Sequence, residues 1–494
     1  MKATKVSEPL RTLPDDDDHP YRSGAWAPNL AEWDAHDLEV VEGEVPLDLQ
    51  GIYLRNTENP VHPSIGMYHP FDGDGMIHQL HLADGRASYR NRFVRTAGFL
   101  AEQEAAGPLW TGMLDMPANS LRPDGWGARG RMKDGSSTDV VVHNGKALTS
   151  FWMCGDLYGL DPLTLEQLGP EAWVPEEGIS AHTKVDEVTG EMLVFNYGKQ
   201  APYMHYGVVS ADGVLTHWTP IPLPGPRLPH DMAFTKNYSI LNDLPLFWDP
   251  ELLPKGYHAA RFHPDLPTRF AIVPRYGQPE DIVWFEARPC YVLHWMNAYE
   301  EGDEVVLDGY FQEDPQPPPL AGYPPKIAQM MAYLDEHSMK PRLYRWRFNL
   351  KTGAVREGPL DDRILEFGSF NQQIAGTKGR YLYSTTAKPG WFLFDGLVKH
   401  DLETGRSWSL GFGEGRYGSE APFAPRVGAV EEDDGYLVSF ITDMAENLSE
   451  CVLIDAKDVE AGPVCRIRLP HRISSGTHAT WASGESLRRQ QAAL

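Results

Sequence analysis

The sequence lacks the features of several large protein classes. Only four cysteines occur in 494 residues, and no two of them form a CxxC pair. This disfavours a disulfide framework or a cysteine zinc site and predicts buried thiols in a reducing compartment. No segment approaches eighteen consecutive apolar residues, and the first residues contain no apolar signal-sequence core. We therefore expect a cytoplasmic protein that does not span a membrane.

Positive charge is also scarce, with 44 Lys and Arg residues against 69 Asp and Glu residues and a net charge of -25. A nucleic-acid partner needs a basic surface, so this class of function is disfavoured. The sequence contains no GxSxG or P-loop motif. By contrast, 41% of the residues are hydrophobic and 11% are aromatic, which is enough for a large folded core.

From Leu38 onward the chain consists of short segments rich in β-branched and aromatic residues, separated by Gly, Asp and Pro. Examples are residues 51–55, 77–82 and 140–143, and this pattern is typical of β-strands. Asn144-Gly145 follows the third example and predicts a two-residue hairpin, because both residues tolerate positive φ. These observations predict an all-β fold.

A weak repeat lies in turns that open with an acidic or amide residue. Its period is about fifty residues, as in a four-stranded propeller blade. The alternative is a common turn without any structural repeat. We predict a polar N-terminal arm over residues 1–35, a single β-propeller domain over 36–486 and a C-terminal tail over 487–494. The turns begin at Asp161, Asp212, Asn349, Asp401 and Asp455.

Two segments interrupt the strand pattern. The proline-rich stretch 314–325 predicts a stiff loop, followed by a helix over residues 326–337 with Ile327, Met330, Met331 and Leu334 on one face. Residues 243–250 are apolar but contain two prolines, which favours a loop. Its part from Leu244 to Trp248 could line a tunnel, contact a membrane surface or simply pack inside the protein.

Four isolated histidines occur in similar small or apolar settings, and His294 stands at the start of a predicted strand. Their spacings are too long for a zinc finger, so they meet only if the chain returns repeatedly to one axis. Neutral imidazoles without thiolates favour iron with positions open to oxygen or substrate. The alternative is four satisfied core histidines. The four are His182, His230, His294 and His478, and the competing candidates are His62, His69, His78, His81, His143, His205 and His217.

In these residues the sequence resembles the carotenoid cleavage oxygenase family, from about Val41 to Trp481. The resemblance implies a seven-bladed propeller capped by loops and helices, with Fe2+ on its axis held by the four histidines. It further implies O2 and a hydrophobic conjugated alkene as substrates, and two carbonyl products. The segments that carry it, besides the four histidine contexts, are residues 51–56, 69–76, 93–96 and 431–435.

The resemblance also implies carboxylates that support the histidines, because a ligating imidazole needs its other nitrogen held. Glu366 and Glu420 match two of the family's three glutamates. The third is expected near residues 149–152 and is missing there. Asp156 or a water would have to replace it behind His230.

Two positions of the sequence bear on the class of substrate. Family members that cleave hydroxystilbenes hold the phenol with a lysine and a tyrosine, and Phe151 and Leu114 stand at those positions here. This apolar pair favours a carotenoid or apocarotenoid. Cleavage of a lignostilbene, stilbene or alkenylphenol is the alternative, with Lys133 as a nearby phenol anchor. A non-catalytic propeller scaffold with structural histidines is the alternative from another class.

Overall fold

The computed structural model describes residues 1–122, 132–255, 257 and 259–492. Antiparallel sheets dominate these residues, and the α-helices are only four to nine residues long. The prediction of an all-β chain is therefore confirmed. Two compact units form, one from Met1–Ala181 with Ser409–Leu494 and one from His182–Trp408. Within the described ranges, no helix is long and apolar enough to cross a membrane.

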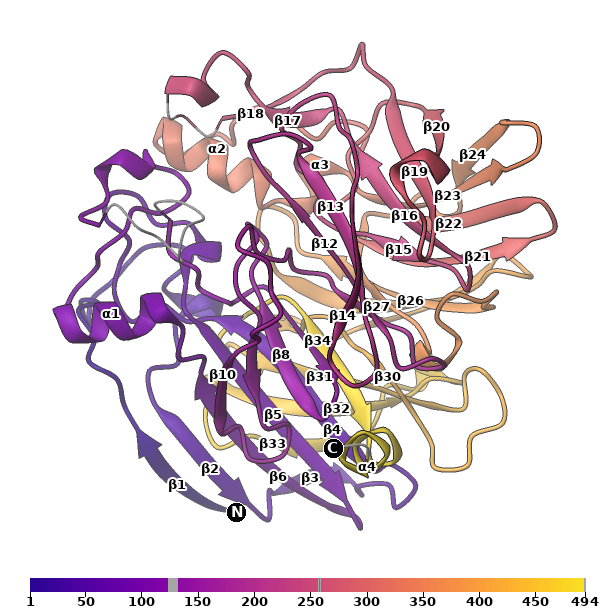
Figure 1. The fold of residues 1–494 in the computed structure, drawn as a ribbon. Helices are drawn as coiled ribbons and strands as arrows, with labels where there is room; N and C mark the ends of the chain where they lie inside the picture. Colours follow the sequence, from indigo (N-terminus) through magenta and orange to yellow (C-terminus); the bar gives the residue numbers. More distant parts are fainter. Residues whose placement is uncertain (123–131, 256, 258, 493–494) are drawn as a thin grey trace. The chain divides into compact units, whose positions relative to one another are not determined.

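The first unit contains three sheets and the helices α1 (Ala97–Ala105) and α4 (Gly484–Ala492) (Figure 1). One sheet has the order β1 (Lys2–Ser7), β2 (Glu32–His36), β6 (Arg86–Phe93), β5 (Gly75–Ala83), β4 (Gly51–Glu58) and β34 (Ala479–Ser483). The next is β10 (Gln167–Pro170), β9 (Tyr158–Leu160), β8 (Lys146–Ser150) and β7 (Asp139–His143). The third is β29 (Arg416–Tyr417), β31 (Gly435–Asp443), β32 (Leu448–Asp455), β33 (Pro463–Arg468) and β3 (Val40–Gly43), with β30 (Phe423–Pro425) also paired to β31.

Strands from the two ends of the sequence complete two of these sheets. β34 pairs with β4, so that Ala479 lies opposite Arg55, and β3 pairs with β33, so that Val40 lies opposite Ile467. Both pairings are antiparallel. The hydrogen bonds of these ladders therefore join segments that are more than four hundred residues apart in the sequence.

The second unit contains four four-stranded sheets, a two-stranded sheet and the helices α2 (Pro325–Tyr333) and α3 (Glu336–Met339) (Figure 1). Each four-stranded sheet follows the order of the chain except that β17 (Leu246–Trp248) and β18 (Ala260–Phe262) form the separate pair. The first two sheets are β11 (Lys184–Val185), β12 (Met192–Tyr197), β13 (Met204–Val209) and β14 (Leu215–Pro220), then β15 (Ala233–Phe234), β16 (Tyr238–Asp243), β19 (Thr268–Pro274) and β20 (Val283–Ala287). The last two are β21 (Trp295–Glu301), β22 (Glu304–Phe311), β23 (Arg342–Asn349) and β24 (Val355–Pro359), then β25 (Leu365–Ser369), β26 (Tyr381–Ala387), β27 (Phe394–Asp401) and β28 (Arg406–Gly411).

The repeated turns of the sequence occupy the same place in five sheets. Each joins the last two consecutive strands of its sheet, as Asp161 does between β9 and β10. Its carboxylate accepts hydrogen bonds from the backbone N–H groups of Leu163 and Thr164, at 2.9 and 2.7 Å. Asp401 accepts the equivalent pair from Glu403 and Thr404. A side chain that closes its own turn explains why Asp or Asn recurs there. The fifty-residue period is therefore the period of the sheets.

The hairpin predicted at Asn144-Gly145 is confirmed. Both residues have positive φ, 47° and 68°, and His143 pairs with Lys146 across the turn. A type I′ turn of this kind matches the right-handed twist of the strands that it joins.

Three local features were not predicted from the sequence. The N-terminal arm contains β1, which pairs with β2 although its side chains are polar and mostly exposed. An edge strand is held by backbone hydrogen bonds and needs no apolar face, so hydropathy did not reveal it. The helix predicted over 326–337 is two helices, because Asp335 caps a new one at Glu336. Helix α4 includes residues 487–492 of the predicted tail. The single domain over 36–486 stays a prediction.

The stretch Leu244 to Trp248 is also different from the expected loop. Residues 246–248 form β17, and the side chains of Leu244, Leu246, Phe247 and Trp248 are all buried. The ring of Phe247 lies between the Arg227 guanidinium, 3.9 Å from its centroid, and the stacked imidazole of His263, at 4.2 Å. These side chains pack internally, and a membrane contact of this stretch stays a prediction.

Candidate metal centre

Three of the four predicted histidines come together in the second unit. The Nε2 atoms of His182 and His230 are 3.1 Å apart. The imidazole centroid of His294 lies 5.0 Å from that of His182 and 5.4 Å from that of His230. His182 and His294 are buried, whereas His230 is partly exposed. Residues separated by up to 112 positions in the sequence thus share one site.

Each histidine occupies the same structural position. His182 lies shortly before β11, His230 before β15 and His294 directly before β21, and each of these strands is the terminal strand of its sheet. In the first unit His478 directly precedes β34, which is likewise terminal. His182 has φ 64°, in the left-handed region. A non-glycine residue is held there only when its surroundings demand it, and such residues concentrate at functional sites.

Glu366 on β25 supports His294. Its carboxylate accepts a hydrogen bond from Nδ1 of His294 at 2.7 Å and from the backbone N–H of Phe367 at 2.7 Å. The side chain of Glu366 is completely buried. Because the carboxylate holds the proton on Nδ1 of His294, the lone pair on Nε2 can bind a metal ion.

Residues next to Glu366 fix this pair in place. Phe367 has φ 46°, and its ring centroid lies 4.7 Å from that of His294. Gly368 follows, and a Cβ atom there would collide with the Met296 sulfur and the Tyr310 hydroxyl. Glycine at this position leaves room for these two side chains from β21 and β22 beside the Glu366–His294 pair.

The geometry of the three imidazoles fits a metal ion. Two nitrogen donors at right angles around an ion, with metal–nitrogen bonds of about 2.1 Å, lie about 3.0 Å apart. The two Nε2 atoms of His182 and His230 are 3.1 Å apart, and the ligand atoms of His182 and His294 lie within 4.8 Å of each other. A donor set of neutral imidazoles suits iron and other borderline transition metals.

In the first unit, a comparable arrangement holds His478. Its Nδ1 lies 3.2 Å from the carboxylate of Glu420, which also accepts the backbone N–H of Ala479 at 2.9 Å. The carbonyl oxygen of His478 accepts the backbone N–H of Asn56 at 3.0 Å. The two predicted glutamates therefore each contact the Nδ1 atom of a predicted ligand histidine.

Sequence reasoning missed Glu58, a further carboxylate in the first unit. Its side chain is buried and accepts a hydrogen bond from the hydroxyl of Thr477, next to His478, at 3.1 Å. Burial raises the pKa of Glu58 to about 8. The segment around residues 149–152 supplies no carboxylate, and the backbone N–H of Asp156 donates to the buried Asp134 at 3.0 Å. A role of Asp156 behind His230 stays a prediction.

Several competing histidines have protein partners that account for their burial. His78 contacts the hydroxyls of Thr57 and Tyr89, at 2.9 and 2.7 Å, and burial lowers its pKa. His217 contacts the carbonyl oxygen of Gly277 at 3.1 Å. Hydrogen-bonded histidines of this kind are structural.

The predicted substrate residues lie in the first unit. Phe151 is buried in a small apolar cluster with Met132, against which Met113, Trp152 and Met153 pack. Leu114 is half-buried. These contacts give Phe151, which directly follows β8, an apolar environment, whereas Leu114 lies on a separate segment between α1 and β7.

Lys133 has an environment of a different kind. Its ammonium group forms ion pairs with the buried carboxylates of Asp74 and of Glu102, the latter at 2.6 Å. The two carboxylates raise the pKa of Lys133. A cation that two buried carboxylates already neutralise is poorly placed to hold a phenolate.

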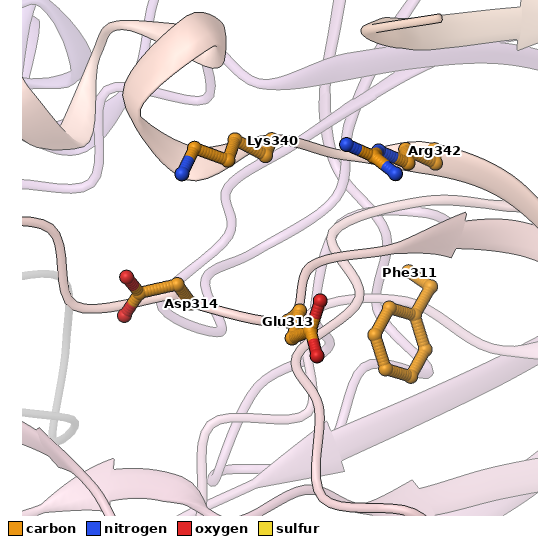
Figure 2. A pocket seen from close by; sticks show the side chains of 5 residues that line it. All are labelled: Phe311, Glu313, Asp314, Lys340 and Arg342. Carbon is orange, nitrogen blue, oxygen red and sulfur yellow. The ribbon is translucent and has the colours of Figure 1, made fainter. Parts of the chain in front are cut away.

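A separate pocket of about 330 Å³ lies in the second unit, beside the ends of β22 and β23 (Figure 2). Glu313 and Asp314 form one side, and Lys340 and Arg342 the other, and the Phe311 ring completes the lining beside Glu313. Four charged groups line this pocket, so it does not suit an apolar substrate. None of the predicted tunnel residues lines it.

Comparison with known proteins shows the family to which the chain belongs. The family model described as "Retinal pigment epithelial membrane protein" (RPE65) matches residues 26–483. A carotenoid 9,10(9',10')-cleavage dioxygenase of Crocus sativus is 34% identical over 95% of this chain and 90% of its own length. An isoeugenol monooxygenase of Pseudomonas nitroreducens is 31% identical over 94% of this chain and 98% of its own. The crystal structure of Pseudomonas brassicacearum lignostilbene dioxygenase has a TM-score of 0.83 and 29% identity, covering 96% of this chain and 100% of that one.

These matches extend over nearly the whole chain, and the three relatives named above are oxygenases. This favours the enzyme over a non-catalytic scaffold. The predicted fold class, a seven-bladed β-propeller, is likewise confirmed by the seven sheets of four or more strands and by the structural match. The chain thus belongs to the RPE65 family of carotenoid cleavage oxygenases.

Proposed function

We propose that this protein is an iron(II)-dependent dioxygenase that cleaves a conjugated carbon–carbon double bond of a carotenoid or apocarotenoid with O2, giving two carbonyl products. The observation that carries the proposal is the cluster of His182, His230 and His294 with the buried Glu366 behind it. Such a site has the donor atoms and the supporting carboxylate that an iron centre requires.

The proposed ligands are these three histidines together with His478. Glu366 would keep the proton of the His294 imidazole on Nδ1, and Glu420 would do the same for His478, so that Nε2 of each faces the ion. Their negative charge offsets part of the +2 charge that four neutral ligands leave uncompensated. Bound iron(II) would supply a redox-active centre with positions open to O2.

The apolar character of the substrate is supported by the loop around Phe151. A long conjugated hydrocarbon needs apolar walls, and Phe151 lies among methionines and Trp152. Lys133 is neutralised by Asp74 and Glu102, which disfavours it as a phenol anchor. The 34% identity to a carotenoid dioxygenase points in the same direction.

A second candidate is cleavage of a lignostilbene or alkenylphenol to aromatic aldehydes. It is supported by similarity to an isoeugenol monooxygenase and to a lignostilbene dioxygenase. The proposed compartment is the cytoplasm, which agrees with the four buried cysteine thiols.

Product analysis distinguishes the two candidates. The iron-loaded protein is given an equal mixture of an apocarotenal and a 4-hydroxystilbene under ¹⁸O2, and the aldehydes are identified by mass spectrometry. We expect labelled apocarotenoid aldehydes. Labelled benzaldehydes alone would favour the second candidate, and the absence of products from both substrates would contradict the proposal. The His294→Ala variant is the control for activity that does not depend on the site.

A further inference from the structure

One buried carboxylate connects the segments of the three clustered histidines. Asp231 follows His230 directly, and its side chain is about 1% exposed. Its Oδ2 accepts the backbone N–H of Trp295, the residue after His294, at 2.8 Å. Its Oδ1 contacts the ammonium group of Lys184, two residues after His182, at 2.7 Å.

Further hydrogen bonds hold Asp231 itself. Its Oδ1 also accepts the backbone N–H of Met232 at 2.7 Å. Its carbonyl oxygen accepts the side-chain amide of Asn242 at 2.7 Å and the indole N–H of Trp295 at 3.3 Å. Trp295 therefore donates both of its N–H groups to the same residue. The ring of Trp295 packs edge-to-face on the buried Trp346, with centroids 5.4 Å apart, which anchors this connection in the core of the unit.

We infer that Asp231 is a positioning residue for the metal centre, which fixes the mutual distances of His182, His230 and His294 by tying their three chain segments to one carboxylate. The inference rests on the proposed function, because it concerns the same histidines. It adds a residue that has no contact with the proposed ion and acts only through the histidine segments.

The charge of the carboxylate is needed for this role. Lys184 and Asp231 neutralise each other, so the pair adds no net charge beside the proposed ion. Asparagine has nearly the same shape, but it would turn an N–H group toward either the Trp295 N–H or the Lys184 ammonium. A donor would then face a donor, and the ammonium would remain beside a divalent cation without its partner. Both effects loosen the histidines and oppose metal binding.

The test compares Asp231→Asn with Asp308→Asn. Asp308 is a matched control: it is buried in the same unit and paired with Arg345, at 2.7 and 2.8 Å, on strands β22 and β23. Metal-free proteins are titrated with Co2+, whose visible absorption reports the number and geometry of its ligands. Circular dichroism at the same temperature establishes that each variant is folded.

We expect Asp231→Asn to bind Co2+ about 10- to 100-fold more weakly, as for other outer partners of metal ligands, and with an altered absorption band. Asp308→Asn should keep the band and the affinity even if its melting temperature falls. A purely structural role of Asp231 would lower the melting temperature and leave the band unchanged, which would overturn the inference.

Lys184→Met provides a second, milder variant, and it decides the question if Asp231→Asn does not fold. It removes only the connection to the His182 segment, so we expect a smaller loss of affinity with a shifted band. An unchanged band and affinity in that variant would overturn the inference. If the unchanged protein binds no Co2+, the proposed function falls and the inference falls with it. If the unchanged protein binds Co2+ and Asp231→Asn binds it equally well, only the inference falls.

Discussion

Replacing Glu366 tests how much a buried carboxylate contributes to metal affinity. Its loss in Glu366→Ala removes the acceptor of the His294 Nδ1–H and of the Phe367 N–H, both at 2.7 Å. Removing such an outer partner costs about 10- to 100-fold in affinity, which is about 1.4 to 2.7 kcal/mol. Glu366→Gln retains an oxygen acceptor but loses the charge. Because a charge-assisted hydrogen bond is about twice as strong as a neutral one, we expect about half of this free energy to be lost, or roughly 3- to 10-fold in affinity.

The assay is an anaerobic titration of metal-free protein with Fe2+ against a competing chelator, which gives the dissociation constant of each variant. Glu336→Gln is the control, since Glu336 is another buried glutamate of the same unit and lies on α3. Its affinity should equal that of the unchanged protein. Equal affinity of Glu366→Ala and the unchanged protein would refute the reasoning, as would a loss in Glu366→Gln as large as that in Glu366→Ala.

Three other variants test the metal ligands, a buried ion-pair cluster and the pKa of a buried glutamate. His294→Ala should abolish both iron binding and turnover, measured by metal analysis and product formation; full activity would contradict the ligand assignment. Lys133→Met should destabilise the fold by about 3–5 kcal/mol in urea unfolding, because it leaves two buried carboxylates without their cation; an unchanged midpoint would argue against this ion-pair cluster. Burial and the neighbouring Asp335 raise the pKa of Glu336 to about 8. The folded state therefore binds more protons than the unfolded state between about pH 4.5 and 8, so stability should fall as the pH rises through this window. Glu336→Gln should weaken this fall, and equal slopes for both proteins would contradict it.

The sequence pattern predicted the repeating sheets because their turns are local. Asp161 and Asp401 bind backbone groups two and three residues away, so the signal is contained in a few consecutive letters. The four histidine contexts were recognisable in the same way, although their meeting in space had to be supplied by the family resemblance. The contacts of Glu366 and Glu420 with Nδ1 atoms agree with that resemblance.

What the sequence did not predict depends on contacts between distant segments. Asp231 is one acidic residue among 69 Asp and Glu residues, and only the folded chain brings it to Trp295 and Lys184. At β17 the sequence favours a loop, because prolines flank this strand. Its side chains are all buried, so the alternation typical of a strand is missing. In β1, the stabilising groups are backbone atoms, which leave no mark on the residue types.

The pairing of β34 with β4 and of β3 with β33 sets an order of events during protein synthesis. Strand β4 leaves the ribosome early, but its terminal partner is made more than four hundred residues later. Until then the nascent chain presents an open edge of hydrogen-bonding groups, which is a template for pairing with another chain. The first unit therefore cannot complete this sheet until residues 479–483 have been synthesised. A chain truncated before residue 479 would keep the edge of β4 open and would be prone to aggregation.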